Sequence, residues 1–262
     1  MNTTVYIADC HPNGGIDVYD FCDGILHPKQ RVPLDRPMYL CCDGNSLYCV
    51  LRAPFADGTS GILSFSVAED GTLSRPGRML STEGIVGCHL CVKDGAVFCA
   101  NYLSGSVNKL GVKTVTHTGK GVHPTRQDAP HTHFTRISPD GNYLFVCDLG
   151  LDTVFVYDLD LCLVSTARVP AGHGVRHLEY AADGKIVYSV NELKSTVSVF
   201  EYADGKLTDI TTVNALPPAF SGVNTAAAIK RDQNTLYVSH RGYDGICVFD
   251  IRDSIPQWIA AF

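Results

Sequence analysis

The 262-residue sequence has few charged side chains: they make up 18% of the chain, against about 25% in an average globular protein. The 21 basic residues are outnumbered by 27 acidic ones, which gives a net charge of −6. This balance argues against a protein that binds nucleic acid or an anionic membrane through a broadly basic surface, so we expect neither as a partner. This charge balance remains compatible with a local basic pocket for a small anion.

The sequence also lacks membrane and export signals. No apolar run approaches the roughly 20 residues that are needed to span a bilayer. Residues 1–5 lack the basic and apolar regions of a secretory signal. The 11 cysteines, an odd number scattered through apolar stretches, then indicate reduced and buried thiols. We therefore expect a cytoplasmic protein, and nothing in the sequence indicates its oligomeric state.

Motifs for common metals, cofactors and nucleophiles are missing as well. Cys88-His89-Leu90-Cys91 is a lone CxxC pair, without the second pair that a structural zinc site needs. The chain has no G-x-S-x-G motif for a serine nucleophile and no glycine-rich phosphate loop that follows a strand. We therefore expect neither a metal nor another cofactor.

What the sequence does contain is a repeat. Polar turns recur every forty to fifty residues or so, and each is followed by two apolar segments with alternating pattern. The five turns start at Asp43, Asp94, Asp140, Asp183 and Asp232. An incomplete further copy occupies residues 5–21. Asp-Gly supplies the positive φ of tight hairpins, and nowhere does an apolar stripe with the helical period persist. The repeat therefore predicts strands joined by hairpins.

A period of this length with three or four strands per unit is typical of β-propeller blades. We predict an all-β protein, a single β-propeller domain over residues 1–262, built from about six units with four-stranded antiparallel blades. The apolar tail Ser254–Phe262 does not resemble a fourth strand. The last unit is therefore expected to stop at its third strand near Ile251, so that either an N-terminal strand completes this sheet or the chain is C-terminally incomplete.

Polar side chains gather where the innermost strand of a blade starts and the second strand ends, and these positions share one rim of a propeller. The candidates at this rim are His131, His133, Asp148, Arg176, His177, Asn191, Glu192 and Arg241. Histidines, arginines and a carboxylate around one opening can bind an anion and transfer a proton. Taken singly, each of these residues could be structural, and Asp148 and Asn191 are favoured in the turns that follow them.

Five short motifs contain most of these candidates: Arg126–His133, Ser138–Gly141 with Asp148–Gly150, Gly174–His177, Asn191–Leu193 and His240–Asp244. In this order they resemble the bacterial 6-phosphogluconolactonase family of β-propeller lactonases, over about residues 6–251. The resemblance implies a seven-bladed propeller that hydrolyses a small phosphorylated sugar lactone, 6-phospho-D-glucono-1,5-lactone. With about six units, this chain is expected to lack the last blade.

The family's fold is shared with a fungal carboxymuconate lactonising enzyme, and by motif the resemblance implies a catalytic set of His131 or His133 with Arg176, Glu192 and Arg241. Glu192 or a histidine would activate water, one arginine would stabilise the oxyanion, and the other would bind the phosphate. We expect His177, Asn191 and Asp148 to contact the substrate. The chain departs from the family at His240, where Asn is usual, and at Val175, where Pro is usual.

Two other functions fit the same residues. A lactonising cycloisomerase of the carboxymuconate type would use the arginines to bind carboxylates and Glu or His to move a proton. A non-catalytic propeller would serve as a binding scaffold, which is a common use of the fold. The residue types needed for hydrolysis and for cycloisomerisation are the same, so the sequence alone leaves both open.

Overall fold

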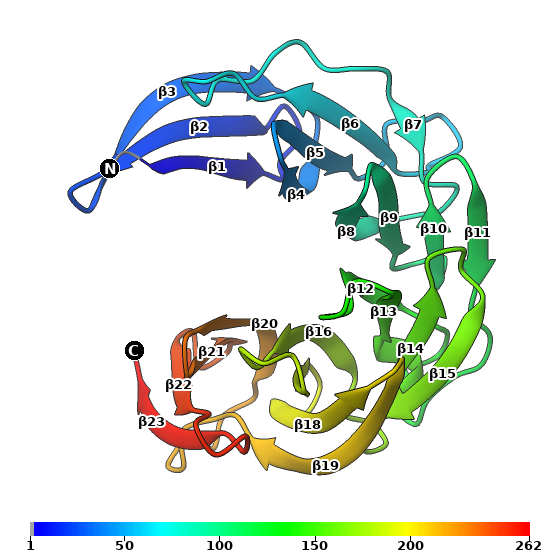
Figure 1. The fold of residues 1–262 in the computed structure, drawn as a ribbon, viewed down its shortest axis with the longest axis vertical. Helices are drawn as coiled ribbons and strands as arrows, with labels where there is room; N and C mark the ends of the chain where they lie inside the picture. Colours follow the sequence, from blue (N-terminus) through cyan, green and yellow to red (C-terminus); the bar gives the residue numbers. More distant parts are fainter. Residues whose placement is uncertain (1–2) are drawn as a thin grey trace. The chain divides into compact units, whose positions relative to one another are not determined.

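The computed structural model describes residues 3–262 and is all-β (Figure 1). Residues 3–262 form six antiparallel sheets that follow one another along the chain, which confirms the predicted blades. The one helical element among these residues is the short 3-10 turn η1 (Leu149–Leu151), and no helix here is long and apolar enough to cross a membrane. Contacts divide the chain into two compact units, Met1–Val115 and Thr116–Phe262.

The first unit holds three sheets. The three-stranded first sheet consists of β1 (Thr3–Asp9), β2 (Gly15–Cys22) and β3 (Ile25–Pro33). The second sheet consists of β4 (Pro37–Asp43), β5 (Ser46–Leu51), β6 (Gly61–Ser66) and β7 (Leu80–Ser81). The third consists of β8 (Gly87–Lys93), β9 (Ala96–Asn101), β10 (Ser106–Lys109) and β11 (Lys113–Thr116), whose last residue begins the second unit.

The second unit holds three four-stranded sheets. The first consists of β12 (Thr132–Ile137), β13 (Tyr143–Asp148), β14 (Thr153–Asp158) and β15 (Leu163–Arg168). The second consists of β16 (Val175–Tyr180), β17 (Ile186–Asn191), β18 (Thr196–Ala203) and β19 (Lys206–Asn214). The third consists of β20 (Thr225–Asp232), β21 (Thr235–Arg241), β22 (Ile246–Asp250) and β23 (Gln257–Ala261).

Neighbouring sheets of the second unit pack face to face through apolar side chains. Phe145 and Phe200 belong to the core between its first and second sheets, and Tyr188 and Phe249 belong to the core between its second and third sheets. Strand β17 lies in the middle sheet, which is covered on both faces, so its residues after Ile186 are all buried. Burying one such large side chain contributes about 1.5–3 kcal/mol, which makes this unit a firm support for loops at its rim.

The last sheet corrects the prediction for the C-terminal tail. Strand β23 pairs antiparallel with β22, with Cys247 opposite Ala261, and supplies the fourth strand that the sequence was not expected to contain. The sheet therefore needs no strand from the N-terminal segment. Trp258 packs edge-on against Phe249, with 5.8 Å between ring centroids. The strand is short, and none of its side chains is fully buried. Its sequence therefore lacks the alternation of apolar and polar residues that marks a strand.

The innermost strand of every four-stranded sheet has a register irregularity near its start. In the second unit it lies between Thr132 and Phe134, between Val175 and His177, and between Ala226 and Ile229. A β-bulge re-aims the side chain of the extra residue and is common next to active sites. In β12 and β16 the extra residues are His133 and Arg176, two of the predicted catalytic residues.

Candidate functional site

Glu192 lies at the centre of an arginine cluster in the second unit. Its Oε2 accepts a hydrogen bond at 2.9 Å from Arg176 Nε and forms an ion pair at 2.9 Å with Arg241 Nη2, and its Oε1 accepts a short hydrogen bond from Arg126. The Glu192 side chain is only 3% exposed, whereas those of Arg126 and Arg241 are 38% and 52% exposed. One carboxylate thus neutralises one of three guanidinium charges, and two positive charges remain at a face that solvent can reach.

Backbone hydrogen bonds fix the turn that carries Glu192. Its amide donates to Gly174 O at 2.8 Å, and its carbonyl accepts from Ala226 N at 3.0 Å. Gly174 has φ +68, and a Cβ there would lie 2.7 Å from Leu193 Cγ, so only glycine suits this position. Asp152 accepts from the amide of Gly174 at 2.6 Å and so holds the supporting loop. The carboxylate is therefore presented by a turn tied to the loops on both sides.

Arg241 is positioned by a second turn. Besides forming the ion pair with Glu192, its Nη2 donates to Ala226 O at 3.1 Å. The next residue, Gly242, has φ +117, and a Cβ there would lie 2.2 Å from Val223 O, so a side chain is excluded. Asn224 Oδ1 accepts from Tyr243 N at 2.9 Å and fixes the far side of the turn.

The β-bulges at His133 and Arg176 bring these two side chains together with that of His177. Arg176 Nη1 donates to His177 Nε2 at 3.1 Å and to Ala227 O at 2.8 Å. The His133 and His177 rings meet edge to face with centroids 5.3 Å apart. The structure thus brings together His133, Arg176, His177, Glu192 and Arg241, although their sequence positions lie in three different sheets.

The pKa values of the central groups follow from burial and from the arginines. Burial alone would raise the pKa of Glu192, but the hydrogen bond from Arg126 and the charges of Arg241 and Arg176 outweigh it and lower the pKa. Glu192 is therefore a carboxylate at neutral pH, and its interaction with three guanidinium groups makes it a weak base. Of the two groups expected to activate water, Glu192 or a histidine, these contacts disfavour Glu192.

Desolvation lowers the pKa of His133 well below 6.5, and the charges of Arg176, Arg241 and Arg126 lower it further. Its imidazole is consequently neutral at pH 7, the protonation state that a proton acceptor needs, although the same effects make it a weaker base than an exposed histidine. The second histidine of the motif has other neighbours, since the His131 amide donates to Asp148 Oδ1 at 2.8 Å and its ring lies 3.5 Å from Asp128 Oδ1. These contacts favour His133 over His131 as the proton acceptor.

Asp148 and Asn191 make internal hydrogen bonds. Asp148 is fully buried and, besides the His131 amide, accepts a 2.6 Å hydrogen bond from His117 Nδ1. Asn191 is also fully buried, and its Nδ2 donates to Thr196 Oγ1 and Ser198 Oγ at 3.0 and 2.9 Å. Contact of either residue with substrate stays a prediction, and these bonds instead favour the turn role that the sequence also allowed.

Arg126 was missed as a site residue, although it opens the first family motif. It lies on the loop between β11 and β12, which has no regular structure and no periodic pattern. The buried Gln127 holds this loop, because its Nε2 donates to Leu149 O at 2.9 Å and its Oε1 accepts from His123 N at 3.0 Å. The sequence signal that could have marked the position is its place at the start of the motif Arg126–His133.

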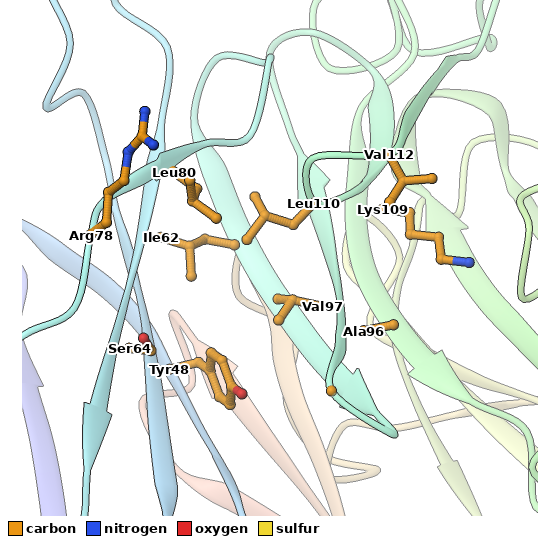
Figure 2. Close-up of a pocket in the computed structure, with 11 residues that line it drawn as sticks. Tyr48, Ile62, Ser64, Arg78, Leu80, Ala96, Val97, Lys109, Leu110 and Val112 are labelled. Carbon is orange, nitrogen blue, oxygen red and sulfur yellow. The ribbon is translucent and has the colours of Figure 1, made fainter.

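An apolar hollow of the first unit contains none of the predicted site residues. Figure 2 shows this pocket of about 330 Å³, with Ile62, Val97 and Leu110 facing one another. Arg78 and Lys109 stand at its edge, with their charged ends directed away from these three side chains (Figure 2). It lacks an acid–base pair. Among residues 3–262, moreover, no three His, Cys, Asp or Glu side chains are grouped to hold a metal ion.

The chain is similar over nearly its whole length to known proteins and structures. Two proteins from Staphylococcus aureus strains, named only as uncharacterized, are 33% identical over 281 residues that cover 96% of this chain and 80% of theirs. The structure of a candidate 6-phosphogluconolactonase from Bacteroides fragilis is 26% identical, with a TM-score of 0.87 over 99% of this chain and 81% of that one. The periplasmic gluconolactonase PpgL from Pseudomonas aeruginosa is 27% identical, with a TM-score of 0.87 over 100% and 82%.

A family model described as a lactonase with a seven-bladed β-propeller matches residues 4–259. The described residues form six sheets, one fewer than that description. Since the match covers almost the whole chain, the protein belongs to the lactonase family of β-propellers.

Proposed function

We propose that the protein hydrolyses 6-phospho-D-glucono-1,5-lactone to 6-phosphogluconate. The observation that carries this proposal is the combination of a neutral, partly buried imidazole at His133 with three arginines around Glu192. An ester that bears a phosphate needs a proton acceptor for water, a donor for the carbonyl oxygen and cations for the phosphate. The cluster contains a group for each of these needs.

In the proposed reaction, His133 accepts a proton from water while the water oxygen bonds to the lactone carbonyl carbon. Arg176, the least exposed of the three arginines, donates to the oxyanion that develops. The intermediate then collapses, the bond from carbon to the ring oxygen breaks, and this oxygen takes the proton back from His133. The new carboxylic acid loses its own proton to solvent, so the net change is addition of one water molecule.

The other two arginines suit the phosphate. Arg126 and Arg241 each place one guanidinium nitrogen on Glu192, and their side chains are 38% and 52% exposed, so a phosphate can reach them from solvent. A guanidinium fork matches phosphate oxygens in two-point geometry, and charge-assisted hydrogen bonds of this kind are the strong ones. Glu192 acts as the anchor that holds the three cations in place, and not as the base. We place this activity in the cytoplasm, where buried thiols such as those of Cys49, Cys99, Cys147 and Cys247 stay reduced.

The test is hydrolysis of the phosphorylated lactone by the purified chain, measured against the uncatalysed rate, with D-glucono-1,5-lactone and 3-carboxymuconate as alternative substrates. We expect kcat/KM for the phosphorylated lactone to exceed that for the unphosphorylated one at least tenfold. His133→Gln should lower kcat at least a hundredfold, while the exposed control Glu201→Gln should not change it. Preference for the unphosphorylated lactone, or conversion of carboxymuconate alone, would refute the proposed substrate.

A further inference from the structure

A second cationic site lies in the second unit, beside strands β14 and β15. Two adjoining hollows of about 220 and 360 Å³ share the side chains of Lys120, Leu151 and Arg168. The first hollow is also lined by Thr118, Thr153, Phe155 and Thr166, and the second by Asp152, Val122 and Val169. We call the two together the Lys120–Arg168 groove. It shares no lining residue with the Glu192 cluster.

The two cations of this groove have no acidic partner. Lys120 and Arg168 are both exposed, and within residues 3–262 neither forms an ion pair. Asp152 lines the second hollow, but its two oxygens accept from the amides of Gly172 and Gly174 at 2.7 and 2.6 Å. Two like charges along one groove repel each other unless an anion lies between them. The two cations outnumber the one carboxylate of the groove, so surplus positive charge is left for a negatively charged ligand.

The remaining lining fits a phosphoryl group attached to an organic body. Thr118 and Thr166 add hydroxyl groups, and Thr153 Oγ1 donates to Leu151 O at 2.7 Å and can still accept a hydrogen bond. Phe155 stacks on the buried His117 ring, with centroids 3.8 Å apart, so its orientation is fixed. With Leu151 it forms an apolar wall beside the cations. Guanidinium, ammonium and hydroxyl donors next to an aromatic ring suit an aromatic or similarly apolar phosphate ester.

We propose that the Lys120–Arg168 groove binds a small organic phosphate, with the phosphoryl group between Lys120 and Arg168 and the organic part against Phe155 and Leu151. This site is separate from the proposed lactone site and does not depend on the activity assigned there. Inorganic phosphate offers the same charge without the apolar part. The affinities therefore tell whether the groove selects an organic phosphate or any phosphate ion.

The test is calorimetric titration of the full chain with phenyl phosphate, methyl phosphate and inorganic phosphate. The matched variants are K120Q/R168Q and the control K185Q/K230Q, which changes the net charge equally at two exposed lysines of the same unit. The variant R176Q/R241Q identifies binding at the Glu192 cluster. We expect K120Q/R168Q to weaken phenyl phosphate binding at least tenfold, the control to weaken it less than twofold, and this binding to survive in R176Q/R241Q.

Phenyl phosphate should bind at least fivefold more tightly than methyl phosphate to the wild-type chain. Equal affinities for phenyl phosphate and inorganic phosphate would overturn the organic part of the proposal. The site itself would be overturned by a K120Q/R168Q isotherm that superimposes on that of the wild type, or by loss of all binding in R176Q/R241Q. Because both side chains are exposed, unfolding of K120Q/R168Q is not expected, and circular dichroism checks it.

Discussion

Arg126 donates a hydrogen bond to Glu192 across 66 residues of sequence, from an irregular loop to a turn that ends a central strand. With Arg176 and Arg241 it surrounds one carboxylate by three guanidinium groups. Such a cluster carries surplus positive charge, which lowers the pKa of Glu192 against the effect of burial and adds to the desolvation that lowers the pKa of His133. The electrostatics of the site thus depend on a loop that lies outside the regular blades.

Replacing Arg126 tests whether this loop takes part in substrate binding. We expect Arg126→Gln to raise KM for an anionic lactone about tenfold, because a hydrogen bond to a charged group contributes about 1.5–3 kcal/mol. The melting temperature should change little, since the side chain is 38% exposed. Arg126→Lys should restore the charge but only part of the affinity, because ammonium lacks the planar fork.

The control for this experiment is Arg252→Gln, which removes an exposed arginine that pairs with Asp250 at a hairpin. Steady-state kinetics should show no change for this variant. If Arg126→Gln left KM unchanged, the interaction with Glu192 would be structural only.

The pH dependence of stability should show the depressed pKa of His133. Below pH 6.5 a histidine in the unfolded chain gains a proton, whereas His133 in the folded protein stays neutral to a much lower pH. The unfolded state then binds more protons, so the free energy of unfolding falls as the pH drops below about 6.5. The lowered pKa of Glu192 acts in the same direction at lower pH, because its contribution is present above 4.5 and is lost as the pH falls through its folded value.

Urea unfolding at several pH values between 5 and 8 measures this effect. His173 and His240 also have lowered pKa values through burial, so the wild-type curve contains contributions from all three histidines. The difference between the wild type and His133→Gln isolates one of them, and the variant should lose less stability on acidification. In activity, the acid limb of kcat/KM should lie below pH 6.5, and a limb above 7 would contradict a neutral His133.

A buried chain of side chains supports the loop that carries Arg126. His117 Nδ1 donates to Asp148, and a 2.8 Å hydrogen bond joins His117 Nε2 to the Tyr157 hydroxyl. His117→Phe would leave the carboxylate of Asp148 buried without this donor, which costs about 1–3 kcal/mol or more for a charged group. We expect a clear drop in the urea midpoint. Tyr157→Phe removes only a neutral hydroxyl and should cost about 1 kcal/mol, so equal effects would contradict this network.

The sequence was sufficient to predict the blades because their signals are local. Each Asp-Gly hairpin needs a positive φ, and Gly44, Gly95, Gly141 and Gly184 all have it. Strand β23 was missed because it gains its pairing from β22, and its own residues show no alternation. An edge strand of this kind is defined by its partner and not by its pattern.

The sequence predicted which residues would meet at the site, but not which of them would act as the base. The repeat places His133, Arg176, Glu192 and Arg241 at strand starts and ends, so their meeting follows from topology. Whether Glu192 gains or loses basicity depends on how many arginines reach it, and Arg126 reaches it from a loop without a period. The bulge at Arg176 that turns its side chain toward Glu192 is equally invisible in the sequence.

Thiol reactivity should divide the 11 cysteines by burial. Four are buried: Cys49, Cys99, Cys147 and Cys247. Desolvation raises the pKa of Cys49 to about 12 and that of Cys247 to about 11, and the pKa values of Cys99 and Cys147 lie well above 9.0. Because the thiolate is the reactive form, these four should not react with a chromogenic disulfide at pH 8 until the protein unfolds.

Three thiols, Cys10, Cys42 and Cys162, are exposed and should react first in the native protein. Burial raises the pKa of Cys42, so its reaction should be slower than that of the other two. In the variant C10S/C162S the two fastest-reacting thiols should be missing from the native reaction. The number of thiols that react in denaturant should be two lower than in the wild type. Mass spectrometry of trapped native protein identifies the modified positions. Modification of Cys99 or Cys147 before Cys162 would show that the cores between the sheets open more readily than their burial indicates.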